Sequence, residues 1–184
     1  MATRSDIIVE MSNGKFARIY CHWKGYLDHN GRILQGHYNS QERAEALIAL
    51  GDLSSLGEEI GEKHPFDPPP AIKRDGSFEE NPEYTEYKKK YGKWCKAYGR
   101  DRGEKNTEAK IFDTIYEAWP DPETMTEFTY VWTQGRWWVG DADQGIQSLV
   151  SLADALAGKT SVTPDIKVPF VGTVGKHAPL PKSN

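Results

Sequence analysis

The chain has 184 residues, with six Trp, nine Tyr and six Phe, and a formal net charge of −4 at pH 7. This length fits one core, and the aromatic residues supply large buried areas although only 38% of the residues are hydrophobic. The acidic balance excludes a protein that coats nucleic acid through its overall charge, and no apolar run approaches the roughly 20 residues that span a bilayer.

The first predicted element is a β-hairpin. Residues 6–10 and 16–23 have strand-like composition, and the turn signal "SNG" at residues 12–14 separates them. Alternation in the second strand gives it a core face and an opposite face. The core face carries Ala17, Ile19, Cys21 and Trp23, and the opposite face carries Phe16, Arg18, Tyr20 and His22.

A helix follows near residues 40–50. Asn39 is the predicted N-cap, Glu42 stands three residues later, and Gly51 ends the helix. The next segment, up to Pro70, contains several glycines and a run of prolines, and we therefore predict a loop there.

A second helix is predicted over residues 82–98, with Asn81 as its N-cap and Gly99 as its end. Five aromatic residues recur at spacings of three and four, and the lysines fall mostly elsewhere. These aromatics are Tyr84, Tyr87, Tyr91, Trp94 and Tyr98. Either the stripe packs in the core with solvated lysines, or the stretch is a binding patch.

The remaining elements are a short strand, a hairpin and a last helix. Residues 109–119 favour a strand and then a helical turn over one helix. A hairpin around the turn Gln134-Gly135 pairs Trp132 with Trp137. Residues 143–157 are predicted to be helical up to Gly158. The predicted inner stripe of this helix is Ile146, Leu149, Val150, Ala153 and Leu156.

These elements predict an α+β fold. Residues 1–158 form a single domain, in which an antiparallel sheet built from the N- and C-terminal hairpins packs against about three helices. Residues 70–81 are predicted to be a loop or insertion, and residues 159–184 a proline-containing tail.

No motif specifies a reaction. Cys21 and His22 are neighbours on a strand and point to opposite faces, so they cannot pair, and Cys21 is predicted to be structural. Cys21, His22, His29 and His37 lack the paired spacing of a zinc site. We therefore predict no metal, no cofactor and no catalytic residue, and we lean towards a protein that is not an enzyme.

Two segments could bind a partner or ligand. The loop with Gly25, His29 and Arg32 could face an anion, although a turn-rich connection explains its glycines equally well. The basic, aromatic stretch near residues 81–104 could hold phosphates, nucleic acid or an acidic surface. The candidate binding residues are Arg18, Tyr20, His22, Tyr26, Lys88, Lys89, Lys93, Arg100 and Arg102.

The strings "YCHWKGYLDHNGRIL" and "WCKAYGRDRGE" resemble a family of small bacteriophage and prophage proteins. Its members often read Y-C-H-W-D-G-Y near the start and R-D-R-G-E later. The resemblance covers most of the first 104 residues and carries no established activity. Lys24 stands where the family usually has Asp, and Leu27 where Pro is common. The matching positions are Tyr20, His22, Trp23, Tyr26, Arg100, Asp101, Arg102 and Glu104.

This resemblance implies a phage accessory protein in the cytoplasm of a bacterial host. The leading expectation is a binding protein that inhibits a host defence component, with a CRISPR effector among the candidates, by masking a functional surface. One alternative is a sponge for a small nucleotide signal, with a pocket near His22, Arg18 and Arg100 or Arg102. The other is a nucleotide-processing enzyme.

The expected partner is a host defence protein or a small nucleotide. We expect no membrane contact, and nucleic-acid contact only through the local basic patch. The sequence leaves a homo-oligomer open.

Overall fold

The computed structural model describes residues 2–161, whose strands form one mixed sheet. Its order is β4-β3-β2-β1-β6-β7-β8, and β5 also pairs with β2. The strands are β1 (Ser5–Glu10), β2 (Phe16–Trp23), β3 (Leu53–Ser55), β4 (Lys96–Ala97), β5 (Lys110–Phe112), β6 (Phe128–Thr133), β7 (Arg136–Asp141) and β8 (Val150–Ser151).

Short helices connect these strands. They are the π-helix η1 (Leu27–Gly31), α1 (Arg32–His37), α2 (Gln41–Ile48), α3 (Pro82–Tyr91), α4 (Tyr98–Arg102), α5 (Ile115–Ala118), the 3-10 turns η2 (Pro122–Thr124) and η3 (Ile146–Ser148), and α6 (Leu152–Leu156). The architecture is the predicted α+β class. In the described part of the chain, no helix has both the length and the apolar character needed to cross a membrane.

Both predicted hairpins are confirmed. β1 pairs antiparallel with β2, and β6 with β7, where Trp132 faces Trp137 across the predicted turn. The two hairpins join through a parallel pair, β1 with β6, and β2 is also parallel to β3. The sheet is therefore mixed, whereas the sequence predicted an antiparallel one.

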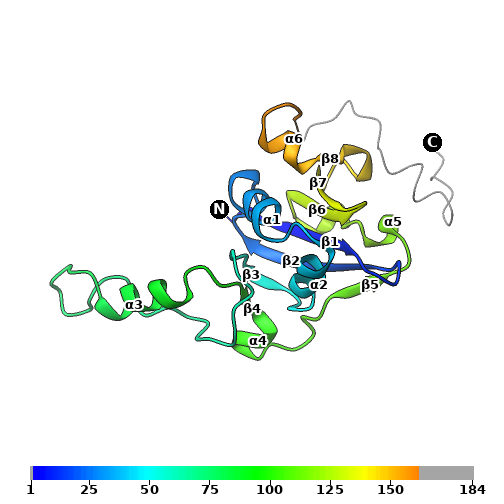
Figure 1. The fold of residues 1–184 in the computed structure, drawn as a ribbon. Helices are drawn as coiled ribbons and strands as arrows, with labels where there is room; N and C mark the ends of the chain where they lie inside the picture. The colour runs from blue at the N-terminus through cyan, green and yellow to red at the C-terminus, as the bar shows by residue number, and fades with distance from the viewer. Residues whose placement is uncertain (1, 162–184) are drawn as a thin grey trace.

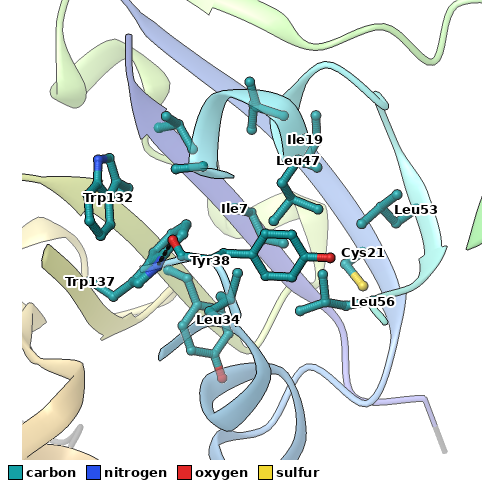
Figure 2. Packing of buried hydrophobic residues seen from close by; sticks show 14 of the residues in the cluster. Ile7, Ile19, Cys21, Leu34, Tyr38, Leu47, Leu53, Leu56, Trp132 and Trp137 are labelled. Atoms are coloured by element: carbon teal, nitrogen blue, oxygen red, sulfur yellow. Dashed lines mark hydrogen bonds between the residues drawn. The ribbon is translucent and has the colours of Figure 1, made fainter. Parts of the chain in front are cut away.

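The sheet has a buried core on each face. The larger cluster packs α1, α2 and α6 against residues such as Ile7, Ile19 and Trp137, as Figure 2 shows for its centre. The smaller cluster, on the opposite face, contains Ile8, Phe16, Val131 and Trp138, with α5 packed against it. This second core explains why Phe16 is buried although the sequence placed it away from the core.

The predicted helix over residues 143–157 is wrong. The chain makes the turn η3, then pairs Val150 with Val139 at the sheet edge, and only α6 is helical. Backbone hydrogen bonds to β7 replace those of a longer helix, and a helical turn then starts at Ser151, whose side chain caps α6. Ala153, expected inside, is exposed, whereas Leu152 and Ala155 are buried.

The helix predicted over residues 82–98 is shorter than expected. Asn81 caps α3 as predicted, but the helix ends at Tyr91 with Gly92 as its C-cap. The following residues return to the sheet, because Trp94 bridges Glu59 and β4 pairs with β3. No residue of α3 is buried, so its aromatic residues do not enter the core.

Several smaller expectations also change. Trp23 is 46% exposed, because the core helices do not cover the last residue of β2. Ser40, instead of Asn39, caps α2. The predicted loop before Pro70 contains β3. The strand and helical turn predicted over residues 109–119 are β5 and α5. Most of the predicted tail, from residue 162 on, lies outside the described residues.

Candidate functional site

Polar side chains gather at one end of the smaller core. Asp6 on β1 pairs with Tyr20 on β2 and with Thr129 on β6, so these three side chains lie in one row across the sheet. In the next row, Ile8 and Val131 belong to the apolar cluster, whereas Arg18, the partner of Ile8 on β2, is charged. This face of the sheet therefore changes from apolar to polar around these two rows.

A pocket of about 310 Å³ opens beside this row. We call it the Asp6 pocket. Its lining combines two carboxylates, two cations, a phenol and a hydroxyl, which come from three strands and two connecting segments. The lining residues are Asp6, Arg18, Ile19, Tyr20, Asp52, Lys110 and Thr124.

Asp6 is the most deeply buried charged group of the pocket. Its residue is only 5% exposed. Burial raises the pKa of its carboxyl to about 6, and the charge of Asp52 adds to this rise, against a hydrogen bond with Thr126 and the charges of Arg18 and Lys110. Asp6 therefore titrates just below neutral pH.

Two buried oxygens near the pocket lack a hydrogen-bond partner among the described residues. They are Oδ2 of Asp6 and Oγ1 of Thr129. An unsatisfied buried polar atom costs about 1–3 kcal/mol, and natural proteins retain few of them. Asp6, which lines the pocket, thus has an oxygen that can still accept a hydrogen bond.

The other charged groups of the pocket have distinct environments. Burial raises the pKa of Asp52, whose Oδ1 accepts the backbone N–H of Tyr20 at 2.8 Å. Arg18 donates from Nη1 to the carbonyl of Ala118 at 2.8 Å, and its guanidinium lies 5.0 Å from the ring centre of Phe112. These contacts fix Arg18 at the wall of the pocket.

Tyr20 links the pocket to the sequence motif that contains His22. The hydroxyl of Tyr20 is joined to Nδ1 of His22 by a 2.7 Å hydrogen bond, and the His22 ring meets that of Trp23 edge to face at 4.6 Å. Tyr26 is 41% exposed, and its ring lies 6.2 Å from that of His29. Of the predicted binding residues Tyr20, His22 and Tyr26, Tyr20 lines the Asp6 pocket, as does the predicted binding residue Arg18.

A second candidate surface is the arm, defined as residues 60–93, which carries α3 away from the sheet (Figure 1). The parallel bridge between Glu59 and Trp94 closes its base. Gly61 lies against the indole of Trp94, and a Cβ at this position would overlap the ring. The base of the arm is therefore tightly built.

Arg100 and Asp101 anchor this base. Arg100 donates to both carboxylate oxygens of Asp101 at 2.8 and 3.0 Å, and also to the carbonyls of Ile60, Gly61 and Cys95. The pKa of Asp101 is lowered because these hydrogen bonds and two backbone N–H donors outweigh its burial. Arg100 was predicted to bind a ligand, but its guanidinium is occupied by contacts within the protein.

The other basic residues of the predicted patch lie over aromatic rings or near acids. Arg102 stands 4.5 Å from the ring centre of Phe66 and pairs with Glu104. On α3, Lys88 lies over Tyr84. Lys93 pairs with Glu58 at 3.3 Å. Lys89 is exposed.

The position of the lysines on α3 also has a structural explanation. Lys88, Lys89 and Lys90 occupy the last turn of α3, where cations are favoured by the helix dipole. Lys88, Lys89, Lys93 and Arg102 are exposed, whereas Arg100 is largely buried. None of these five residues lines the Asp6 pocket.

The tip of the arm exposes two large apolar side chains. A bridge between Ile72 and Glu80 closes the tip, and Phe78 stands within it at a left-handed φ of 56°. Phe78 is 86% exposed and Ile72 is 51% exposed. The sequence predicts a loop over this segment and gives no signal that Phe78 is a contact residue.

Among residues 2–161, the cysteines and histidines do not form a metal-binding cluster. Both cysteines are buried, and burial raises the pKa of Cys21 to about 12. Within residues 2–161, no three His, Cys, Asp or Glu side chains are placed to hold a metal ion.

The comparisons with known proteins add no functional information. No protein-family model, no curated protein and no solved structure matches this chain. The candidate function therefore depends on the two surfaces described above.

Proposed function

We propose that this chain is a phage accessory binding protein that inhibits a bacterial defence component in the host cytoplasm. The arm is its partner-facing element, and it blocks a functional surface of the partner when it binds. The resemblance of residues 20–34 and 94–104 to phage proteins supports the biological setting. The single observation that supports binding through the arm is the exposed tip with Phe78.

An exposed aromatic ring on a projecting segment is suited to anchor an interface. Phe78 is 86% exposed, so almost its whole ring is available to a partner. Buried aromatic side chains contribute a large share of the affinity in protein interfaces. The base of the arm is held by the contacts of Arg100 and Asp101, which limits the conformational entropy lost when the arm binds.

A plating assay tests the proposed role. Phage are plated on host strains that each carry one defence system, with and without expression of the chain. We expect the plating efficiency to rise on at least one strain, and to fall back to the level without the chain for the variant Phe78→Ala. Removing a hot-spot aromatic costs about 2 kcal/mol or more, which weakens binding about 30-fold.

Ile111→Ala is the matched control, because Ile111 is an exposed apolar residue on β5, outside the arm. It should retain the full effect. Plating that never changes across a broad panel would refute the defence role. Full activity of Phe78→Ala would refute the role of the arm tip and leave the defence role standing.

A further inference from the structure

The Asp6 pocket has an unsatisfied acceptor that binding through the arm does not explain. Oδ2 of Asp6 is a buried acceptor without a partner among the described residues, although the residue is only 5% exposed. The carboxyl of Asp6 has a hydrogen bond with Thr126, but its second oxygen has none in the described part of the chain. A buried oxygen without a hydrogen bond destabilises the fold, so its retention points to a ligand that satisfies it. Such a ligand donates an N–H or O–H group towards Asp6.

The charges of the pocket define the rest of the ligand. Asp6 and Asp52 disfavour a purely anionic molecule, whereas Arg18 and Lys110 disfavour a purely cationic one. The complementary molecule has a donor-bearing part at the carboxylates and an anionic part at the cations. A phosphate group is well suited to the planar guanidinium of Arg18 and the ammonium of Lys110.

The size and the lining of the pocket favour a nucleotide over a smaller molecule. Its volume of about 310 Å³ lies at the lower end of the range of pockets that hold organic ligands. An amino acid or inorganic phosphate would leave much of this space empty. Tyr20 adds an aromatic side chain to the lining, which a flat base could contact.

We propose that the Asp6 pocket binds a nucleoside phosphate whose base carries an exocyclic amine. The amine donates to Oδ2 of Asp6, and the phosphate lies between Arg18 and Lys110. This site differs from the one expected from the sequence, because His22, Arg100 and Arg102 are not among its lining residues. It is also independent of the arm, so either proposal can fail without the other.

Calorimetry on the full chain tests this assignment. The probes are the 5′-monophosphates of guanosine, adenosine, cytidine and uridine, the four nucleosides, and inorganic phosphate. We expect at least one nucleotide with an amino group on its base to bind about tenfold or more tightly than uridine monophosphate, its own nucleoside and inorganic phosphate. Each of these three probes lacks either the amine or the phosphate, and therefore loses a charge-assisted hydrogen bond that the nucleotide makes.

Variants place the binding in the pocket. Asp6→Asn and Lys110→Ala should each weaken the affinity about tenfold or more. Lys159→Ala, at an exposed lysine that does not line the pocket, should leave the affinity unchanged. Lys110 is exposed, so Lys110→Ala tests the site without changing a buried residue. The absence of binding for all probes at millimolar concentration would overturn the proposal. Equal affinity of a nucleotide and its nucleoside, or unchanged affinity in Lys110→Ala, would also overturn it.

Discussion

The substitution Asp101→Ala should strongly destabilise the protein, because it removes the acceptor that holds the base of the arm. The Asp101 carboxylate accepts two hydrogen bonds from Arg100. It also accepts the backbone N–H of Ala97 at 2.8 Å and that of His64 at 3.2 Å. The Asp101 side chain is 0% exposed, and that of Arg100 is 18% exposed. The variant therefore leaves a largely buried guanidinium without its counter-ion and two backbone donors without their acceptor.

The size of the effect follows from this geometry. Removing one partner of a buried ion pair typically costs about 3–5 kcal/mol. Arg100 keeps its hydrogen bonds to three backbone carbonyls, which compensate part of the loss. We therefore expect the lower end of the range, about 3 kcal/mol of unfolding free energy.

Urea unfolding followed by circular dichroism measures this change. The matched control is Arg102→Ala, which removes an ion pair from the same sequence motif. The Arg102 and Glu104 side chains are 48% and 45% exposed, so their pair should contribute less than about 1 kcal/mol. If the two variants differ by less than about 1 kcal/mol, the anchoring role assigned to Asp101 is wrong.

The pH dependence gives a second measure of the same anchor. The pKa of Asp101 is lower in the folded chain than its ordinary value of 3.8. Its contribution to stability is therefore present above this ordinary value and disappears as the pH falls through the folded pKa. The stability difference between the wild type and Asp101→Ala should shrink in acid, and a difference that does not depend on pH would contradict the assigned ion pair.

Three further predictions concern the Asp6 pocket, the thiols and the arm. In the folded chain Asp6 has a pKa of about 6, above its ordinary value of 3.8, so its contribution to stability falls as the pH rises between these values. Asp6→Asn should then stabilise the protein by up to about 3 kcal/mol at pH 7 and have little effect near pH 4, and urea titrations with no such trend would refute the raised pKa. Cys21 and Cys95 are buried with raised pKa values, so thiol reagents should label neither in the native protein and both after unfolding; rapid native labelling would contradict their burial. Gly61→Ala should lower the unfolding free energy by at least about 1 kcal/mol, because Gly61 has a φ of 66° and faces the Trp94 ring. An unchanged urea midpoint would show that the base of the arm can accommodate the added methyl group.

Local sequence patterns determined the hairpins and one helix of this protein. The two-residue turn at Gln134 fixes the register in which Trp132 faces Trp137, since a tight turn leaves only one pairing of its flanking strands. The alternation in β2 correctly predicted that Ala17 and Cys21 are buried. These features depend on interactions between residues close in the chain, and for that reason the sequence alone reveals them.

Tertiary contacts decided what local patterns left ambiguous. The apolar residues after Gly145 suit a helix, but β7 offers an unpaired edge, and the chain extends there as β8. The aromatic spacing of α3 suits a core helix, yet no residue of α3 is buried, because the chain projects as an arm. Both outcomes depend on which surfaces the rest of the fold leaves available.

The candidate site shows the same division. Alternation along β2 placed Arg18 and Tyr20 on one face, and both line the Asp6 pocket. Asp6 is the first residue of the strand-like segment "DIIVE". A charged residue on a predicted strand was the only indication in the sequence that Asp6 belongs to a site. Asp52 and Lys110 gave no signal, because they reach the pocket from segments far along the chain. Side-chain alternation is a local property of the backbone, whereas the meeting of distant carboxylates and cations requires the folded sheet.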